Sequence, residues 1–199
     1  MKTLCMDSAH KHLVIALYSD ETLVAVCEKE AWKKQSESMF PELMKLMEEV
    51  GWDSDDLDQV VITKGPGSYT GVRIAMSIAK VLCTTKHIPL YTISTFQMYA
   101  GLCEHALVLL DARSSRAYCG ILSNGVILEQ SIRTLEDIQK NVLEEDMTLY
   151  GDMDLIGKEA SKEEFAKNFM LVKHAWEKVE NIHTLVPMYL KEQDAYKVK

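Results

Sequence analysis

The chain has 199 residues, with 30 acidic against 22 basic side chains and a net charge of -8. Phosphate backbones are bound by clustered Lys and Arg, so this charge excludes a broad nucleic-acid surface that works without a more basic partner. The five cysteines form no C-x-x-C pair, and no apolar run reaches the roughly 18 residues of a membrane span, so we expect reduced thiols in a cytoplasmic protein.

Three short apolar runs open the chain and predict a three-stranded meander. They cover residues 3–7, 12–18 and 22–28, with a turn at Ser19-Asp20-Glu21 between the last two. A helix is expected at 38–50, where apolar residues recur at intervals of three and four. Strand 59–64, helix 71–86, strand 88–93 and a short helix near 95–103 follow in the same pattern.

The second half repeats this order at a distance of 104 residues. Strand patterns at 107–111, 116–122 and 126–130 match the first three, and Asp111 aligns with Asp7. Thr134 is expected to cap a helix that runs to about 143, followed by strand 147–150 and short helices near 152–158, 162–168 and 174–181. The repetition predicts an α/β fold with two small domains, 1–103 and 104–199, each with a mixed sheet and flanking helices. This duplicated plan is the architecture of the actin, sugar-kinase and Hsp70 superfold.

The matched acids suggest a cleft between the two domains. In that superfold an acid after each first strand faces nucleotide phosphates or their metal, and Asp7 and Asp111 occupy those places. With Ser8 and Arg113 they form a candidate vestigial nucleotide cleft. The alternative is that each acid only makes turn hydrogen bonds at the end of its strand, and the sequence leaves both interpretations open.

A glycine-rich loop joins strand 59–64 to helix 71–86. Its candidate functional residues are Gly65, Pro66, Gly67, Ser68, Tyr69, Thr70, Gly71 and Arg73. A strand, glycine loop and helix in this order direct backbone N–H groups toward one point. However, no Lys-Ser or Lys-Thr follows Gly71, which excludes a nucleotide P-loop. The alternative is a tight turn that lets the helix pack closely on its sheet.

These motifs resemble the TsaB family, also called YeaZ. The resemblance is carried by Met6-Asp7-Ser8, by residues 65–74, by Asp111-Ala112-Arg113 and by Pro187-Met188-Tyr189-Leu190-Lys191, and it is weak between about 130 and 185. It implies a non-catalytic dimerisation subunit of the bacterial complex that makes threonylcarbamoyladenosine in tRNA. The implied partners are the transferase paralogue TsaD, the ATPase TsaE, and a second copy of the chain when it is alone. Contact with tRNA would come only through the complex, and no membrane contact is implied.

The resemblance also implies that the isolated chain binds no cofactor tightly, with ATP and Mg entering only in the complex. The catalytic relative holds a metal through a His-x-x-x-His helix. None of the six histidines forms that pair; they are His10, His12, His87, His105, His174 and His183. We therefore expect no metal site and no catalytic residue.

Helix 71–86 carries two apolar stripes on roughly opposite sides, which indicates burial against its own sheet and against something else. The resemblance implies that this helix and helix 38–50 form a pairing surface with the partner. The expected interface residues are Met39, Leu43, Met47, Val72, Ala75, Met76, Ala79 and Leu82. The sequence does not decide which stripe faces the partner, and an internal helix covered on both sides remains the alternative.

Two enzymatic alternatives follow from the same residues. An ATP-dependent phosphotransferase of the sugar-kinase superfold would need Asp7 and Asp111 to hold Mg-ATP, together with a base that the sequence does not reveal. Metal-dependent hydrolysis would need a bound zinc or iron. The older label "glycoprotease" finds no support, because Ser68 lacks the G-x-S-x-G spacing of a nucleophile elbow.

Overall fold

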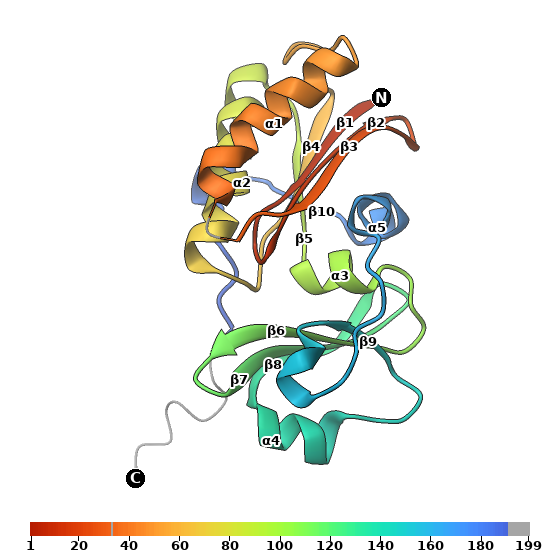
Figure 1. Ribbon diagram of the computed structural model, residues 1–199. Coiled ribbons are helices and arrows are strands. Elements are labelled where there is room, and N and C mark those ends of the chain that lie inside the picture. The colour runs from red at the N-terminus through yellow and green to blue at the C-terminus, as the bar shows by residue number, and fades with distance from the viewer. Residues whose placement is uncertain (33, 191–199) are drawn as a thin grey trace.

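The computed structural model describes residues 1–32 and 34–190 and contains two sheets (Figure 1). The first sheet has six strands in the order β10-β5-β4-β1-β2-β3, and the second has four in the order β8-β7-β6-β9. The strands are β1 (Lys2–Asp7), β2 (His12–Ser19), β3 (Thr22–Glu30), β4 (Gln59–Thr63), β5 (Leu90–Ile93), β6 (Ala106–Arg113), β7 (Arg116–Ser123), β8 (Val126–Thr134), β9 (Thr148–Gly151) and β10 (Glu177–Lys178). Lys191, the last residue of one family motif, lies outside the described residues.

The predicted duplication is confirmed by the strand topology. In each half three antiparallel strands are followed by a fourth that lies parallel to the first: β4 beside β1, and β9 beside β6. Strands β2 and β7 start and end 104 residues apart, as do β3 and β8. Even the irregularity in strand pairing recurs, at Leu17/Tyr18 and at Ile121/Leu122. The chain therefore has the duplicated actin-like α/β fold.

The helices separate the molecule into layers (Figure 1). Helices α1 (Gln35–Glu49) and α2 (Tyr69–Lys86) cover the outer face of the first sheet, while α3 (Thr95–Ala100) and α5 (Phe165–Leu171) lie between the two sheets. Helix α4 (Leu135–Asp137) continues into the π-helical turn η1 (Ile138–Val142) on the second sheet. Three apolar cores result, one beneath α1 and α2, one between the sheets and one beneath α4.

The C-terminal part of the chain returns to the first sheet. Helix α5 follows the short 3-10 helix η2 (Met153–Ile156), and the Tyr18 hydroxyl donates a hydrogen bond to the Ala166 carbonyl in that helix, at 2.7 Å. Strand β10 then pairs with β5 between the 3-10 helices η3 (Lys173–Ala175) and η4 (Ile182–Thr184). The predicted helix at 174–181 is therefore wrong. The domain division at residues 103 and 104 stays a prediction, since the segment after residue 164 packs on both halves.

Two further observations bear on the expectations from composition. The five cysteines are free thiols. Across residues 1–32 and 34–190, no helix combines the length and the apolar content that crossing a bilayer requires.

Candidate functional site

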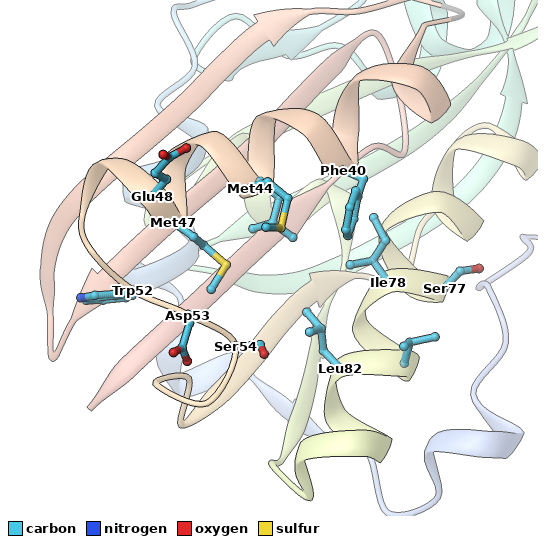
Figure 2. Close-up of a pocket in the computed structure, with 12 residues that line it drawn as sticks. Phe40, Met44, Met47, Glu48, Trp52, Asp53, Ser54, Ser77, Ile78 and Leu82 are labelled. Carbon is cyan, nitrogen blue, oxygen red and sulfur yellow. The ribbon is translucent and has the colours of Figure 1, made fainter.

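Helices α1 and α2 lie side by side and leave an apolar groove between them, which we call the α1/α2 groove (Figure 2). Its volume is about 730 Å³. It is lined by Phe40, Leu43, Met44, Met47, Glu48, Trp52, Asp53, Ser54, Ser77, Ile78, Val81 and Leu82. Three large apolar side chains on its rim are open to solvent: Phe40 is 57% exposed, Met44 52% and Val81 63%. A patch of this kind on a helical surface is typical of a protein-binding site.

Helix periodicity explains the groove and corrects the predicted interface. Met39, Val72, Ala75, Met76 and Ala79 are all buried in the core beneath the helices, so they are not available to a partner. The two alanines let α2 approach its sheet closely, which places this stripe inward. Leu43 and Met47 are also buried but contribute to the groove, and Leu82 is half-buried there.

The stripe of α2 that faces outward is the second one, which includes Ile74, Ile78 and Val81. Ile78 lies across the groove from Phe40 and Met44 of α1 (Figure 2), and Val81 also lines the groove. Sequence reasoning identified two stripes, but the interface residues that it predicted do not include Ile74, Ile78 or Val81. The signal that distinguishes the stripes is residue size, because the alanines lie on the stripe that contacts the sheet.

The glycine loop packs against the turn that follows β1. Ser68 caps α2, its hydroxyl oxygen accepting from the Gly71 N–H at 3.3 Å, and its own N–H donates to the Ala9 carbonyl at 2.7 Å. A Cβ on Gly67 would lie 2.3 Å from the Ala9 carbonyl oxygen, and one on Gly71 would lie 2.3 Å from that of Ser8. The close approach requires glycine at both positions. This geometry agrees with the packing alternative for the loop.

Two motifs far apart in sequence meet at this loop. The Met188 N–H donates to the Lys64 carbonyl at 2.7 Å, and Tyr189 stacks on Tyr69 with ring centroids 5.6 Å apart. The Arg73 guanidinium lies over the Tyr69 ring, 4.4 Å from its centroid. The C-terminal motif therefore fastens the start of α2, which sequence reasoning did not foresee.

A small cleft of about 330 Å³ opens where the glycine loop meets the second half. It is lined by His10, Trp32, Gly67, Ser68, Tyr69, Thr70, Asp111, Ala112, Arg113 and Tyr118. The Asp111 carboxylate accepts from the Arg113 N–H at 2.7 Å, so it supports its own turn. Arg113, Ser114 and Ser115 all have left-handed φ values, of 66°, 54° and 57°. Two of the four predicted cleft residues are thus at the cleft.

The other two, Asp7 and Ser8, are buried behind the glycine loop. The Asp7 carboxylate accepts hydrogen bonds from the Thr63 hydroxyl and from the Ala9 N–H, and burial raises the pKa of Asp7 to about 6. The Ser8 hydroxyl donates to the Gly71 carbonyl at 2.7 Å and accepts from the Ala75 N–H at 3.1 Å. The prediction that all four residues line one cleft is therefore wrong, because Asp7 is bound to Thr63 and Ala9 and Ser8 is bound to α2.

A buried polar contact centred on Asp152 joins the two halves beside this cleft, and its partners include His10 and Asp111 of the cleft lining. The Asp152 carboxylate lies 2.7 Å from His10 Nε2, accepts from the Asp111 N–H at 2.7 Å, and lies 2.5 Å from Lys11 Nζ. Burial alone would raise the pKa of Asp152, but the contacts from His10 and Lys11 hold it well below its usual range. Asp152 and His10 are 142 residues apart, so no local pattern predicts their meeting.

Among the described residues, one group has the composition of a metal site, formed by His105, Glu144 and Asp146. His105 Nδ1 lies 3.1 Å from Asp146, whereas its Nε2 lies 3.9 Å from Glu144. Each ring nitrogen thus faces a different carboxylate, and both carboxylates are exposed. The arrangement fits a surface imidazole in contact with two carboxylates.

The chain thus combines a duplicated actin-like fold with a small polar cleft and an open apolar groove between two helices. The family model "TsaD: tRNA N6-adenosine threonylcarbamoyltransferase" matches residues 26–138, more than half of the chain. The chain therefore belongs to this threonylcarbamoyltransferase family, on the branch of the TsaB (YeaZ) proteins. The resemblance inferred from the motifs is confirmed.

The similar proteins indicate the branch. The tRNA threonylcarbamoyladenosine biosynthesis protein TsaB of Bacillus subtilis is 33% identical over 138 residues, which is 66% of this chain and 60% of that protein. The chain thus matches less than two thirds of that relative's length. TsaB of Buchnera aphidicola (Schizaphis graminum) is 25% identical over 92% of this chain and 82% of its own. A Pseudomonas aeruginosa structure described as similar to peptidase YEAZ shares the fold, with a TM-score of 0.77, 20% identity, and coverage of 96% of this chain and 99% of that one.

Proposed function

We propose that the chain is the non-catalytic pairing subunit in the synthesis of threonylcarbamoyladenosine in tRNA. In this role it binds the transferase subunit TsaD through the α1/α2 groove, and the pair recruits the ATPase TsaE and the tRNA. When the partner is absent, the same surface supports a homodimer. ATP and Mg enter only in the complex.

The observation that carries this proposal is the exposure of Phe40, Met44 and Val81 around an apolar groove. Burying one large apolar side chain stabilises a complex by about 1.5–3 kcal/mol. The three rim residues therefore supply a gain large enough to offset part of the entropy cost of association. The names of the TsaB relatives support the biological setting.

The contacts around the cleft support a non-catalytic role. A phosphotransferase of this superfold needs its first acid at the cleft, whereas Asp7 is buried and its Oδ2 has no hydrogen-bond partner among the described residues. Peptide hydrolysis would need a base beside Ser68. His10 lines the same cleft, but among the described residues no hydrogen bond joins its ring to the Ser68 hydroxyl.

Light scattering on a size-exclusion column tests the proposal, with the chain alone and mixed with the TsaD relative of the same organism. We expect a one-to-one species that Val81→Asp abolishes, because a charge buried without a partner costs several kcal/mol. Leu128→Asp is the matched control, since Leu128 is also 63% exposed but lies on β8. Pairing that survives Val81→Asp would show that the groove is not the interface. ATP turnover by the chain alone would instead favour the phosphotransferase alternative.

A further inference from the structure

One end of the α1/α2 groove is acidic. Glu48 and Asp53 line the groove near Trp52, at the end away from Phe40 (Figure 2). No Lys or Arg is among its lining residues. The groove is therefore apolar along its length and negatively charged at one end, where the last turn of α1 contributes Glu48 and the loop after it contributes Asp53.

The acids around this end differ in whether they have a counter-ion. Asp56 lies 2.5 Å from Lys2, Asp55 pairs with Lys86, and Glu49 lies 3.8 Å from Lys45. In the part of the chain that the structure describes, Glu48 and Asp53 form no such ion pair. Neither of the two acids that line the groove therefore has a cation as a partner among the described residues. Asp53 only accepts a backbone hydrogen bond from Asp55.

The helix end adds to the negative potential. The C-terminus of an α-helix carries a partial negative charge that favours nearby cations. The last turn of α1 has no basic residue, and it holds Glu48 and Glu49 instead. By contrast, the last turn of α2 has Lys86, which is paired with Asp55. The backbone carbonyls at the C-terminus of α1 and the side chain of Glu48 therefore both favour a positive charge at this end of the groove.

A partner that covers the groove removes water from its acidic end. A carboxylate that loses water without gaining a cation weakens the complex, whereas a matched Lys or Arg offsets that loss and speeds association. We infer that the partner seated in the α1/α2 groove presents an apolar helical stripe that ends in a Lys or Arg over Glu48 and Asp53. This inference rests on the proposed pairing function, and the protein that it places in the groove is the TsaD-family partner.

The test is the dissociation constant for the TsaD relative of the same organism, measured by calorimetry at low and high salt. Glu48→Gln combined with Asp53→Asn removes both charges, and the amide oxygen of Asn retains the acceptor for the Asp55 N–H. We expect about threefold to tenfold weaker binding at low salt and a smaller salt dependence than for the wild type. Glu49→Gln is the control, one residue away and outside the groove lining.

The outcomes separate the charge inference from the pairing proposal. The double variant can bind as tightly as the wild type, with unchanged salt dependence, while Val81→Asp still abolishes binding. That result would leave the pairing proposal intact and refute the inference that the partner places a Lys or Arg over Glu48 and Asp53. If only self-association changes, the cation belongs to a second copy and the assignment to the TsaD-family partner is overturned. If the wild type does not bind that relative, both proposals fall together.

Discussion

Removing the Asp152 carboxylate tests whether one buried contact fixes the two halves against each other. Asp152 follows β9 in the second half, and its side chain is 5% exposed. It meets His10 and Lys11 from the turn between β1 and β2 of the first half, and the Asp111 N–H from its own half. Asp152→Ala removes these contacts while leaving the apolar core between the sheets unchanged.

The magnitude follows from what the substitution leaves behind. His10 is 4% exposed and the Asp111 N–H loses its acceptor, and a buried polar group without a partner costs about 1–3 kcal/mol. Lys11 is 38% exposed and regains water, so it adds little. We therefore expect Asp152→Ala to lower the free energy of unfolding by about 3–5 kcal/mol. Asp152→Asn, which keeps one acceptor and no charge, should cost about half as much.

Urea unfolding followed by circular dichroism measures this loss, and thermal unfolding should show a melting temperature lower by roughly 10 °C. Asp154→Asn is the control, because Asp154 is exposed and close in sequence. Hydrogen exchange should also show faster exchange at the Asp111 amide. A loss below about 1 kcal/mol for Asp152→Ala, equal to that of the control, would refute the reasoning, because this is the expected size of a surface contact.

Two further substitutions test the glycine loop and its buried acid. Gly71→Ala should destabilise the protein although alanine favours helices by about 1 kcal/mol, since its Cβ would lie 2.3 Å from the Ser8 carbonyl oxygen. Urea unfolding checks this beside Gly157→Ala, where the Cβ meets nothing within 4 Å and the only cost is that of a side chain at a left-handed φ of 69°. A Gly71→Ala variant that loses no more stability than Gly157→Ala would contradict the steric argument. Asp7 has a folded pKa of about 6, above its unfolded value, so its stabilising contribution is complete below about pH 4 and is lost as the pH rises through 6. Asp7→Asn should therefore remove up to about 3 kcal/mol of the pH dependence of unfolding between pH 4 and 7, and parallel profiles for variant and wild type would contradict the burial argument.

The strands were predictable because each carries its own signal. Alternation and apolar runs mark β2 and β3, and the same spacing recurs 104 residues later in β7 and β8. The first sheet's last strand was not predictable, because β10 has two residues, both exposed, and forms only where the returning chain meets β5. A strand that depends on its neighbour leaves no periodic pattern of its own.

The site was predictable only at the level of elements. The resemblance implied that α1 and α2 form a pairing surface, while helix periodicity showed two apolar stripes on α2 without ranking them. The choice depends on Ala75 and Ala79, whose small side chains favour contact with the sheet but also suit helix pairing. The cleft shows the same limit, since Asp7 and Asp111 occupy equivalent strand ends but only Asp111 is at the cleft.

The two halves have diverged in a way that makes α2 the link between both candidate surfaces. The second half has the short α4 and the turn η1 in place of α1, so within residues 1–32 and 34–190 the outer helix pair and its groove lie on the first sheet alone. Helix α2 begins at the cleft, where Ser68 and Thr70 contribute to the lining, and reaches the groove about two to three turns later at Ser77 and Val81. Its start is held by Ser8 and by the Tyr189 stack. A partner bound in the groove therefore contacts the same rigid helix that forms one wall of the cleft, and no other described element contributes to both.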